Sequence, residues 1–335
     1  MEFTETQEND VIRAVQHCVP FSERPFEEIG RQVGMPEAEV IELLTKWHDH
    51  GTLREISAIL EGSALGHESA LVAGIVPEAQ LDAVVDAINA HPTVTHNYLR
   101  DHEYNLWYTI AAPVEVGLDA MIGALSRQTG IEFHALRRTS TYKIGVNFDL
   151  KTRQNSTQAA PLVTPDEVER TDETIGFFRA LQTPAPITER PFDEVARQHG
   201  VDAGRLLAFG REHLGGAIRR YVGTLRHRKL GVRANAMIVW SVPSEALDAA
   251  GAILAQAPEV SHCYARNAIA GFPYTLYSMI HGPDLSDCER VAARLSDETG
   301  ARDYRLLVSL EEYKKTRLRY FLPELDEWWA AHGGR

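Results

Sequence analysis

The amino-acid sequence is an imperfect tandem repeat, and this feature constrains the fold more than any other. Residues 23–28, Glu-Arg-Pro-Phe-Glu-Glu, return 166 residues later at 189–194 as Glu-Arg-Pro-Phe-Asp-Glu. Gly34 returns as Gly200 at the same spacing. A chain of 335 residues has room for two such copies, and each copy is long enough to bury a core of its own. The sequence therefore predicts two copies of one unit, fused into a single chain.

Each copy opens with a helical pattern and then changes to an alternating one. Proline before acidic residues starts a helix and glycine closes it, which predicts three short helices within 9–50 and again within about 172–214. Helices joined in this way outline a helix-turn-helix unit. The alternating part of the first copy predicts strands near 54–61, 68–76, 93–99, 104–112 and 131–144, with helices near 77–91 and 115–129. The second copy predicts strands near 219–227, 233–242, 259–266, 273–281 and 303–312, with helices near 243–257 and 283–299. We therefore expect an α+β fold in which each helix-turn-helix unit precedes a ferredoxin-like βαββαβ domain.

Shifts in composition place the boundaries between these parts. Residues 151–170 are polar, contain proline and lack an apolar period, which predicts a linker. The end of the chain carries Trp328 and Trp329, which suit a cap on a core or a partner surface. The predicted parts are a helix-turn-helix at 1–56, a ferredoxin-like domain at 57–150, the linker at 151–170, a second helix-turn-helix at 171–218, a second ferredoxin-like domain at 219–319 and a C-terminal tail at 320–335.

The charge of the chain counts against DNA as a ligand. The formal net charge is -13, which repels polyanions over the surface as a whole. A DNA-reading helix also needs Arg, Lys, Asn or Gln on its exposed face. The corresponding helix of the first copy offers Glu37, Glu39 and Glu42 instead. We therefore expect structural helical caps and no DNA partner.

Several other classes of protein lack their sequence signals. Cys18, Cys263 and Cys288 share no CxxC spacing, which indicates neither a disulfide framework nor a zinc ribbon and favours a reducing cytoplasm. The chain contains no GxGxxG, Walker, HExxH or GxSxG motif, and its histidine spacings predict no protein-held metal. Its acidic N-terminal segment is unlike a signal peptide, and its apolar runs are far shorter than the roughly 20 residues that span a bilayer. The sequence predicts a cytoplasmic protein without a membrane partner.

One predicted strand of the first copy has an unusual polar face. Alternation along a strand places His96, Tyr98 and Arg100 on the same side. His102 and Asn105 follow in the turn that leads to the next strand. A solvated face of an amphipathic sheet is the simplest explanation. A binding face is the alternative, because histidine and tyrosine rings are poorly suited to a face that only contacts water.

The two copies retain different polar groups. The second copy keeps this face as His262, Tyr264 and Arg266. It replaces His102 with Ala268, and it alone carries the basic run at 226–229, Arg-His-Arg-Lys, where the first copy has Glu-Gly-Ser-Ala. A basic turn of this kind suits an anionic partner. Two homologous sheets that pack as an internal pseudo-dimer and share one composite pocket would produce this pattern, and so would neutral divergence of two surfaces.

The order of elements resembles the Lrp/AsnC family of transcriptional regulators. The individual motifs resemble those of the siroheme decarboxylase family, in its fused two-subunit form from heme d1 synthesis. This second resemblance covers nearly the whole chain. It rests on His96-Asn97-Tyr98, Arg100, His102, Asn105-Leu106-Trp107, Ile218-Arg219-Arg220, residues 226–231, Ala234-Asn235-Ala236-Met237 and Trp240.

The resemblance implies a carboxy-lyase. The implied reaction removes the acetate carboxylates on rings C and D of siroheme, giving 12,18-didecarboxysiroheme and carbon dioxide in heme d1 or alternative heme biosynthesis. It needs no added cofactor, because the iron belongs to the substrate. The implied partners are the iron tetrapyrrole, a second copy of the chain and other heme d1 pathway enzymes.

The resemblance also implies roles for residues of both copies. His96 and His227 are expected beside the reacting acetates as proton donors or carboxylate orienters. Cations that hold the carboxylates are expected at Arg100 and in the basic run. The candidate catalytic residues are His96, His227, Arg100 and His102, and the candidate substrate-binding residues are Tyr98, Asn105, Arg226, Arg228, Lys229, His262 and Tyr264.

Two non-enzymatic hypotheses stay open at this point. A regulator of the Lrp/AsnC type, or a heme-binding sensor, would bind DNA with an affinity that falls steeply with salt. A tetrapyrrole chaperone would change the spectrum of its ligand without turnover. Carbon dioxide release from siroheme separates the decarboxylase from both.

Overall fold

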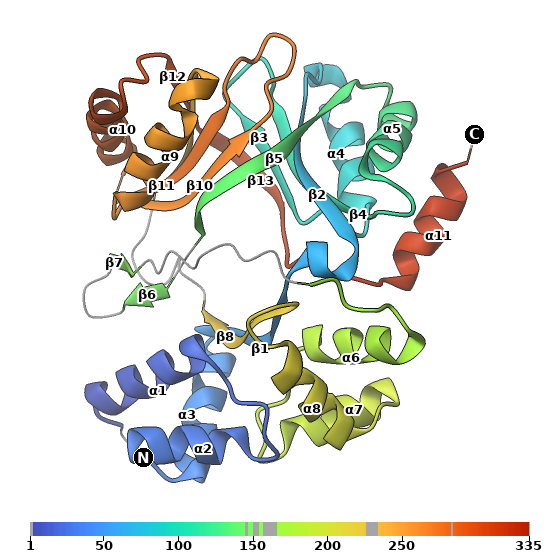
Figure 1. Ribbon diagram of the computed structural model, residues 1–335, viewed down its shortest axis with the longest axis vertical. Helices are drawn as coiled ribbons and strands as arrows, with labels where there is room; N and C mark the ends of the chain where they lie inside the picture. Colours follow the sequence, from blue (N-terminus) through green and yellow to red (C-terminus); the bar gives the residue numbers. More distant parts are fainter. Residues whose placement is uncertain are drawn as a thin grey trace. The chain divides into compact units, whose positions relative to one another are not determined.

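The computed structural model describes residues 3–144, 147–149, 154–156, 166–225, 234–282 and 284–334. The chain divides into two compact units (Figure 1). The first contains Met1–Gly66 and Val163–Leu230, and the second contains His67–Leu162 and Gly231–Arg335. Each unit therefore combines segments from both copies of the repeat. Among the described residues, no helix is both long enough and apolar enough to cross a membrane.

Three helices open the first unit, as the sequence predicts. They are α1 (Glu5–His17), α2 (Pro25–Val33) and α3 (Glu37–Asp49). Thr4 caps α1 through a capping box with Gln7, which satisfies backbone donors that the first turn leaves unpaired. Pro25 stands at the start of α2, and Gly34 ends it in the left-handed conformation with φ of 71°, which a residue without Cβ adopts at no steric cost.

The second copy contributes three helices with the same local signals. They are α6 (Asp172–Gln182), α7 (Pro191–His199) and α8 (Ala203–His213). Thr171 forms the capping box of α6 with Thr174, and Gly200 ends α7 with φ of 66°. The repeated sequence thus produces repeated local structure.

The first strands of the two copies pair with each other. β1 (Leu53–Leu60) and β8 (Ile218–Leu225) form a two-stranded antiparallel sheet in which Ala58 lies opposite Tyr221. The sequence predicts both strands, but it places each beside the ferredoxin-like domain of its own copy. Their actual partners lie in the other copy, because pairing across the repeat gives both strands an antiparallel ladder of backbone hydrogen bonds and buries Tyr221 against Phe21 and Phe192.

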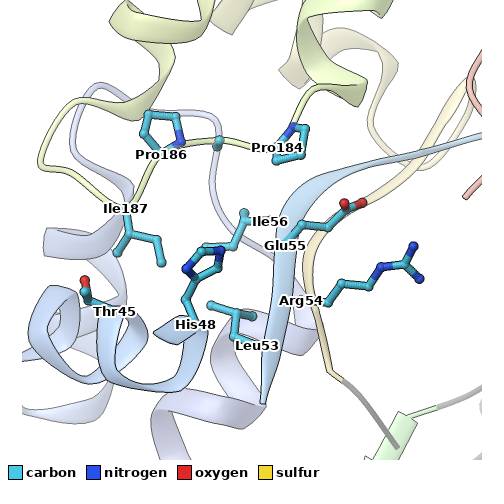
Figure 2. Close-up of a pocket in the computed structure, with 10 residues that line it drawn as sticks. Thr45, His48, Leu53, Arg54, Glu55, Ile56, Pro184, Pro186 and Ile187 are labelled. Carbon is cyan, nitrogen blue, oxygen red and sulfur yellow. The ribbon is translucent and has the colours of Figure 1, made fainter. Parts of the chain in front are cut away.

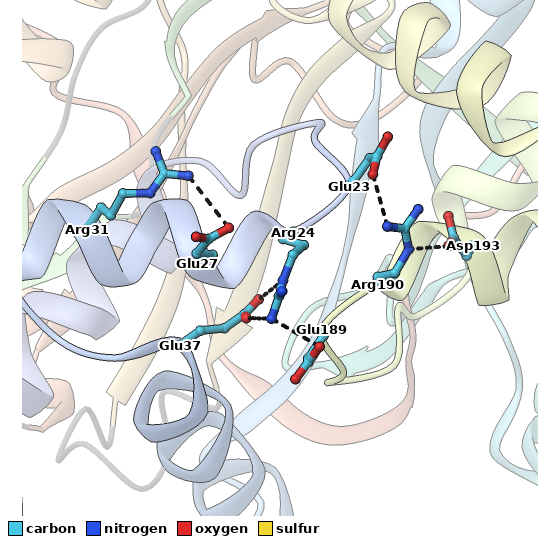
Figure 3. Close-up of polar contacts among 8 residues, drawn as sticks. All are labelled: Glu23, Arg24, Glu27, Arg31, Glu37, Glu189, Arg190 and Asp193. Carbon is cyan, nitrogen blue, oxygen red and sulfur yellow. Dashed lines mark hydrogen bonds and ion pairs between the residues drawn. The ribbon is translucent and has the colours of Figure 1, made fainter.

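The repeated Glu-Arg-Pro-Phe segments meet through reciprocal ion pairs (Figure 3). A guanidinium nitrogen of Arg24 lies 3.0 Å from a carboxylate oxygen of Glu189, and one of Arg190 lies 2.9 Å from Glu23. Arg24 also pairs with Glu37. Arg24 contacts the glutamate before Arg190, and Arg190 contacts the glutamate before Arg24. The two contacts are therefore related in the same way as equivalent contacts in a two-fold dimer. Exposed pairs of this kind set geometry more than stability.

The second unit contains two sets of βαββαβ elements on one nine-stranded sheet, whose order is β12-β9-β11-β10-β5-β2-β4-β3-β13. The first half provides β2 (His67–Gly74), α4 (Leu81–Ala90), β3 (His96–Arg100), β4 (Leu106–Pro113), α5 (Leu118–Thr129) and β5 (Phe133–Ile144). The second half provides β9 (Ala234–Trp240), α9 (Leu247–Gln256), β10 (Val260–Arg266), β11 (Leu276–Gly282), α10 (Leu285–Thr299), β12 (Tyr304–Leu307) and β13 (Ser309–Lys315). Both sets follow the order of elements that the sequence predicts, except that the single strand predicted near 303–312 is divided into β12 and β13.

The last strand of each half pairs with both halves. The first residues of β5, through Arg137, pair with β2, and the rest, from Arg138, pair with β10. In the same way β12 pairs with β9 and β13 pairs with β3, with only Val308 between them. The two outer strands of the sheet are therefore consecutive segments of the chain. This exchange ties the two halves together through main-chain hydrogen bonds.

Side chains of the sheet form cores on both faces. On one face, α4 and α5 cover the first half and α9 and α10 cover the second (Figure 1), with Tyr108 and Trp240 among the buried residues. On the opposite face, alternating residues of both halves meet in one cluster that includes Trp107, Leu136 and Tyr277. We call this second surface the helix-free face, because no described helix of the second unit contributes a residue to this cluster.

The predicted linker and tail contain further short elements. β6 (Asn147–Asp149) and β7 (Gln154–Ser156) pair antiparallel, so the region at 151–170 includes a strand. α11 (Pro323–His332) packs Leu325 and Trp328 into the core of the first half. Of the two roles considered for the tail, the structure supports the cap on a core.

His91 lies at the contact between α11 and α4. Its ring centroid is 4.2 Å from that of Trp328, and the side chain is fully buried. Burial, assisted by Lys314 and His332, lowers the pKa of His91 to about 3. The imidazole is therefore neutral in the folded protein.

This burial predicts a loss of stability in acid. The unfolded chain binds a proton at His91 near pH 6.5 and the folded chain only near pH 3, so stability falls as pH drops from about 6.5, by about 2 kcal/mol at pH 5. In His91→Asn, whose amide oxygen can accept the hydrogen bond from Thr93, urea unfolding at pH 7 and pH 5 should show a correspondingly smaller difference. Exposed His50→Asn is the control. An unchanged pH dependence in His91→Asn would contradict this account.

Candidate functional site

The polar face predicted for the first copy lies on β3 at the helix-free face. The rings of His96 and Tyr98 are stacked with centroids 6.2 Å apart, and the guanidinium of Arg100 lies 5.2 Å from the centre of the Tyr98 ring. Thr95 Oγ1 is 3.0 Å from Nδ1 of His96 and orients that imidazole. The three predicted residues therefore form one continuous stack.

Arg100 anchors this stack to the other half of the unit. Its Nη1 nitrogen donates to the carbonyl oxygen of Leu307 at 2.7 Å and lies 3.2 Å from Ser309 Oγ. The side chain is buried, and desolvation lowers its pKa to about 10. Arg100 thus lies against the Tyr98 ring and is itself fixed by a hydrogen bond to a strand of the second copy.

The turn after β3 holds two more predicted residues. Nδ1 of His102 accepts a hydrogen bond from the backbone N–H of Tyr104 at 3.0 Å, and its ring meets that of Phe272 edge-on at 5.2 Å. Burial lowers the pKa of His102, which favours the neutral imidazole. The side chain of Asn105 makes two hydrogen bonds of 2.8 Å to the backbone of Val76. Its Nδ2 donates to the Val76 carbonyl oxygen, and its Oδ1 accepts from the Val76 N–H. The side chains of His102 and Asn105 therefore both form hydrogen bonds to the backbone of the protein.

The second copy repeats the arrangement on β10. The rings of His262 and Tyr264 lie 6.0 Å apart, and Arg266 lies 5.5 Å from the Tyr264 ring. The Nη1 nitrogen of Arg266 donates to the carbonyl oxygen of Leu136 at 2.7 Å. Leu136 and Leu307 occupy equivalent positions in the two long strands. Each arginine therefore crosses from its own copy to the other.

The second copy adds a histidine that sequence reasoning missed. Ser261 Oγ lies 2.9 Å from Nδ1 of His262 and 2.6 Å from Nε2 of His281. A hydroxyl can donate to one imidazole and accept from another, so the three side chains form a hydrogen-bonded chain. Alternation along β11 and the small, polar Ser261 beside His262 are the signals that could have indicated it.

The basic run of the second copy falls outside the described residues. This applies to the predicted catalytic His227 and to the predicted substrate-binding residues Arg226, Arg228 and Lys229. The strands on either side of the run, β8 and β9, belong to different sheets. The catalytic and substrate-binding roles assigned to the basic run stay predictions.

Local charge differs between the two polar faces. In the first half, the Tyr98 hydroxyl donates to a carboxylate oxygen of Glu312 at 3.3 Å. In the second half, Tyr264 has Arg138 at 5.9 Å in addition to Arg266. Sequence reasoning did not single out Arg138, because its place beside Tyr264 depends on pairing between β5 and β10.

A separate cavity of about 270 Å³ lies in the first unit (Figure 2). Its walls come from the end of α3, from β1 and from the segment 184–187, and include His48, Arg54 and Ile187. Phe21, the counterpart of Ile187 in the first copy, is buried and packs against Phe192. The smaller Ile187 occupies the corresponding position at this cavity, which contains none of the predicted site residues.

No three His, Cys, Asp or Glu side chains within the described ranges are grouped as a metal site requires. The polar faces of β3 and β10 offer imidazoles, phenols and guanidinium groups, with the carboxylate of Glu312 beside Tyr98. Such groups bind carboxylates and transfer protons.

Comparison with known domain families identifies the class of protein. Residues 64–143 and 229–314 match the AsnC-like ligand binding domain, and residues 8–54 match the helix-turn-helix domain of the NirDL-like siroheme decarboxylases. The chain is thus an α+β protein with a helix-turn-helix and two AsnC-like domains.

Similarity to individual proteins extends over nearly the whole chain. The chain is 33% identical to the siroheme decarboxylase of Hydrogenobacter thermophilus over 95% of its length and 96% of that protein. It is 30% identical to the siroheme decarboxylase NirDL subunit of Paracoccus pantotrophus, covering 91% and 94%. Crystal structures of the siroheme decarboxylase NirDL, alone and in complex with an iron-uroporphyrin III analogue, superpose with TM-scores of 0.80 at 28% identity and cover 97% of both chains. The chain belongs to the siroheme decarboxylase family, which consists of carboxy-lyases.

The contacts of Asn105 predict a mainly structural effect of its removal. Asn105→Ala leaves the N–H and carbonyl of Val76 without these partners, which should cost about 2 kcal/mol of stability in urea unfolding. Asp101→Ala, in the same exposed turn, should change stability by less than about 0.5 kcal/mol. Full stability in Asn105→Ala together with weakened tetrapyrrole binding would instead favour a direct contact with the ligand.

Proposed function

We propose that the chain decarboxylates siroheme on its rings C and D acetates, giving 12,18-didecarboxysiroheme and carbon dioxide for heme d1 or alternative heme synthesis. Similarity over 95% of the chain to a siroheme decarboxylase carries this proposal. The complex of a similar NirDL structure with an iron-uroporphyrin III analogue supports a tetrapyrrole as the ligand.

The reaction needs a proton donor and cations. When the bond between the methylene and the carboxylate breaks, carbon dioxide leaves and the electron pair stays on the methylene carbon, where the conjugated macrocycle can delocalise it. An imidazolium then transfers a proton to this carbon and leaves a methyl group. Histidine changes charge near neutral pH, which suits it to this transfer. Arginines hold the remaining carboxylates by charge-assisted hydrogen bonds.

We assign these roles to the polar faces and the basic run. His96 and His227 are the proposed proton donors, and His102 and His262 are the alternatives. Arg226, Arg228 and Lys229 are proposed to bind carboxylates, together with Tyr98, Tyr264 and Asn105. Arg100 is proposed to act through Tyr98, because its Nη1 nitrogen already donates to Leu307.

We further propose that the two copies form an internal pseudo-dimer with a second helix-turn-helix at α6–α8. The reciprocal ion pairs of Arg24 and Arg190 support this arrangement. The crossed hydrogen bonds of Arg100 and Arg266 support it as well. A siroheme decarboxylase beta subunit of Methanosarcina barkeri matches 45% of the chain over 99% of its own length at 39% identity, as expected if one copy corresponds to one subunit.

The charges on α3 support a DNA-binding regulator less than a decarboxylase. Its exposed surface includes Glu42 and Asp49 with Lys46 as the exposed cation. Phosphate contacts need several cations. Binding to duplex DNA that weakens steeply with salt, without turnover of siroheme, would favour a regulator.

The direct test is anaerobic incubation of the purified chain with siroheme, followed by mass spectrometry of the tetrapyrrole. We expect the loss of two carbon dioxide units. An unchanged mass together with a spectral shift would show that the chain binds the tetrapyrrole without decarboxylating it.

Variants of equivalent histidines identify the half that donates the proton. His96→Gln should lower kcat by about 10²- to 10⁴-fold and leave the Kd for siroheme nearly unchanged, and His262→Gln is the equivalent change on the other polar face. His227→Ala should also bind siroheme and lose turnover. If His262→Gln loses activity and His96→Gln retains it, His262 and not His96 is the donor on the polar faces.

A further inference from the structure

Two arginines face each other across the seam between the halves of the second unit. Arg138 on β5 is the register partner of Arg266 on β10. Both guanidinium groups contact the ring of Tyr264, at 5.9 Å and 5.5 Å from its centre. A tyrosine side chain with an arginine from each of two strands therefore lies on the helix-free face.

Like charges placed directly opposite each other on neighbouring strands are unfavourable. Within the described ranges, neither arginine forms an ion pair with a carboxylate. The Nη1 nitrogen of Arg266 donates to Leu136, while its Nε nitrogen is buried without a hydrogen-bond partner among the described residues. Burial, with a smaller contribution from Arg138, lowers the pKa of Arg266. An anion bound at this pair would offset the repulsion between the two guanidinium groups.

The equivalent place in the first half has the opposite character. The strand at 133–144 and the strand at 304–315 correspond residue by residue, since Leu136 and Leu307 accept the equivalent arginine hydrogen bonds. In this alignment Ser309 replaces Arg138 and Glu312 replaces Thr141. Glu312 lies opposite Tyr98 in the register and accepts a hydrogen bond from its hydroxyl. The fold thus presents the same tyrosine twice, once beside an arginine and a carboxylate and once beside two arginines.

We propose that Arg138 and Arg266 form a carboxylate-binding subsite beside Tyr264, which receives an acetate side chain of the tetrapyrrole. This inference rests on the proposed function and adds a recognition site for the anionic periphery of the substrate. Arg266 is held in place by its bond to Leu136, and Arg138 is exposed and closes on the carboxylate from the neighbouring strand. The two cations select ligands that carry a carboxylate at this position over ligands with a methyl group there.

The chain provides a matched control at the adjacent residue. Arg137 points to the other side of the strand, where it pairs with Glu68 at 3.0 Å and Asp119 at 2.7 Å. Arg138→Ala and Arg137→Ala therefore remove the same charge from opposite faces of β5. Neither change disturbs the hydrogen bond that fixes Arg266.

The test is an absorbance titration of the full chain with iron uroporphyrin and with iron coproporphyrin, in which methyl groups replace the acetates. The parent and Arg137→Ala should bind iron uroporphyrin more tightly than iron coproporphyrin. Arg138→Ala should weaken binding of iron uroporphyrin by about 10- to 100-fold and change binding of iron coproporphyrin much less. Arg138→Lys should recover part of the loss.

Three results would overturn the subsite. They are an Arg138→Ala protein with the affinity of the parent, equal losses for both porphyrins, and equal losses in Arg137→Ala. Turnover of siroheme by the parent in any of these cases would leave the proposed function intact. A parent that binds neither porphyrin would also overturn the subsite, whereas an unchanged mass of siroheme is the separate result that overturns the proposed function.

Discussion

Main-chain pairing between the two copies is the constraint on which the rest of the structure depends. β5 and the segment β12–β13 each contribute hydrogen bonds to both halves of the nine-stranded sheet. In the first unit, β1 of the first copy pairs with β8 of the second. Unpaired strand edges are costly and prone to association, so neither copy could bury its edges in this way without the other.

This pairing also places the candidate site. The crossover points of the long strands lie at Leu136 and Leu307, and the two buried arginines bind the carbonyl groups of these residues. Each arginine supports a tyrosine, and each tyrosine contacts a histidine on the same strand. The position of the arginine against each tyrosine therefore depends on a strand from the other copy.

The sequence was sufficient for the features that depend on local chemistry. The prolines, glycines and alternation that define the repeat predicted the helices from α1 to α10, most strands of both halves and the shared face of His96, Tyr98 and Arg100, but neither α11 nor the division of the last strand into β12 and β13. It was insufficient where partners come from the other copy. The pairing of β1 with β8, the bond of Arg100 to Leu307 and the place of Arg138 beside Tyr264 have no signal in the segments themselves. These contacts follow from register between residues far apart in the chain.

The exchanged strands have a consequence for how the chain is made. β13 pairs with β3, and the bond from Tyr98 to Glu312 joins residues 214 positions apart. During synthesis from the N-terminus, β3 leaves the ribosome long before its partner exists. Contacts of such long range slow folding and leave strand edges open to association with other chains. The first half can complete its sheet only after almost the entire chain has been translated, so nascent chains should depend on chaperones at that stage.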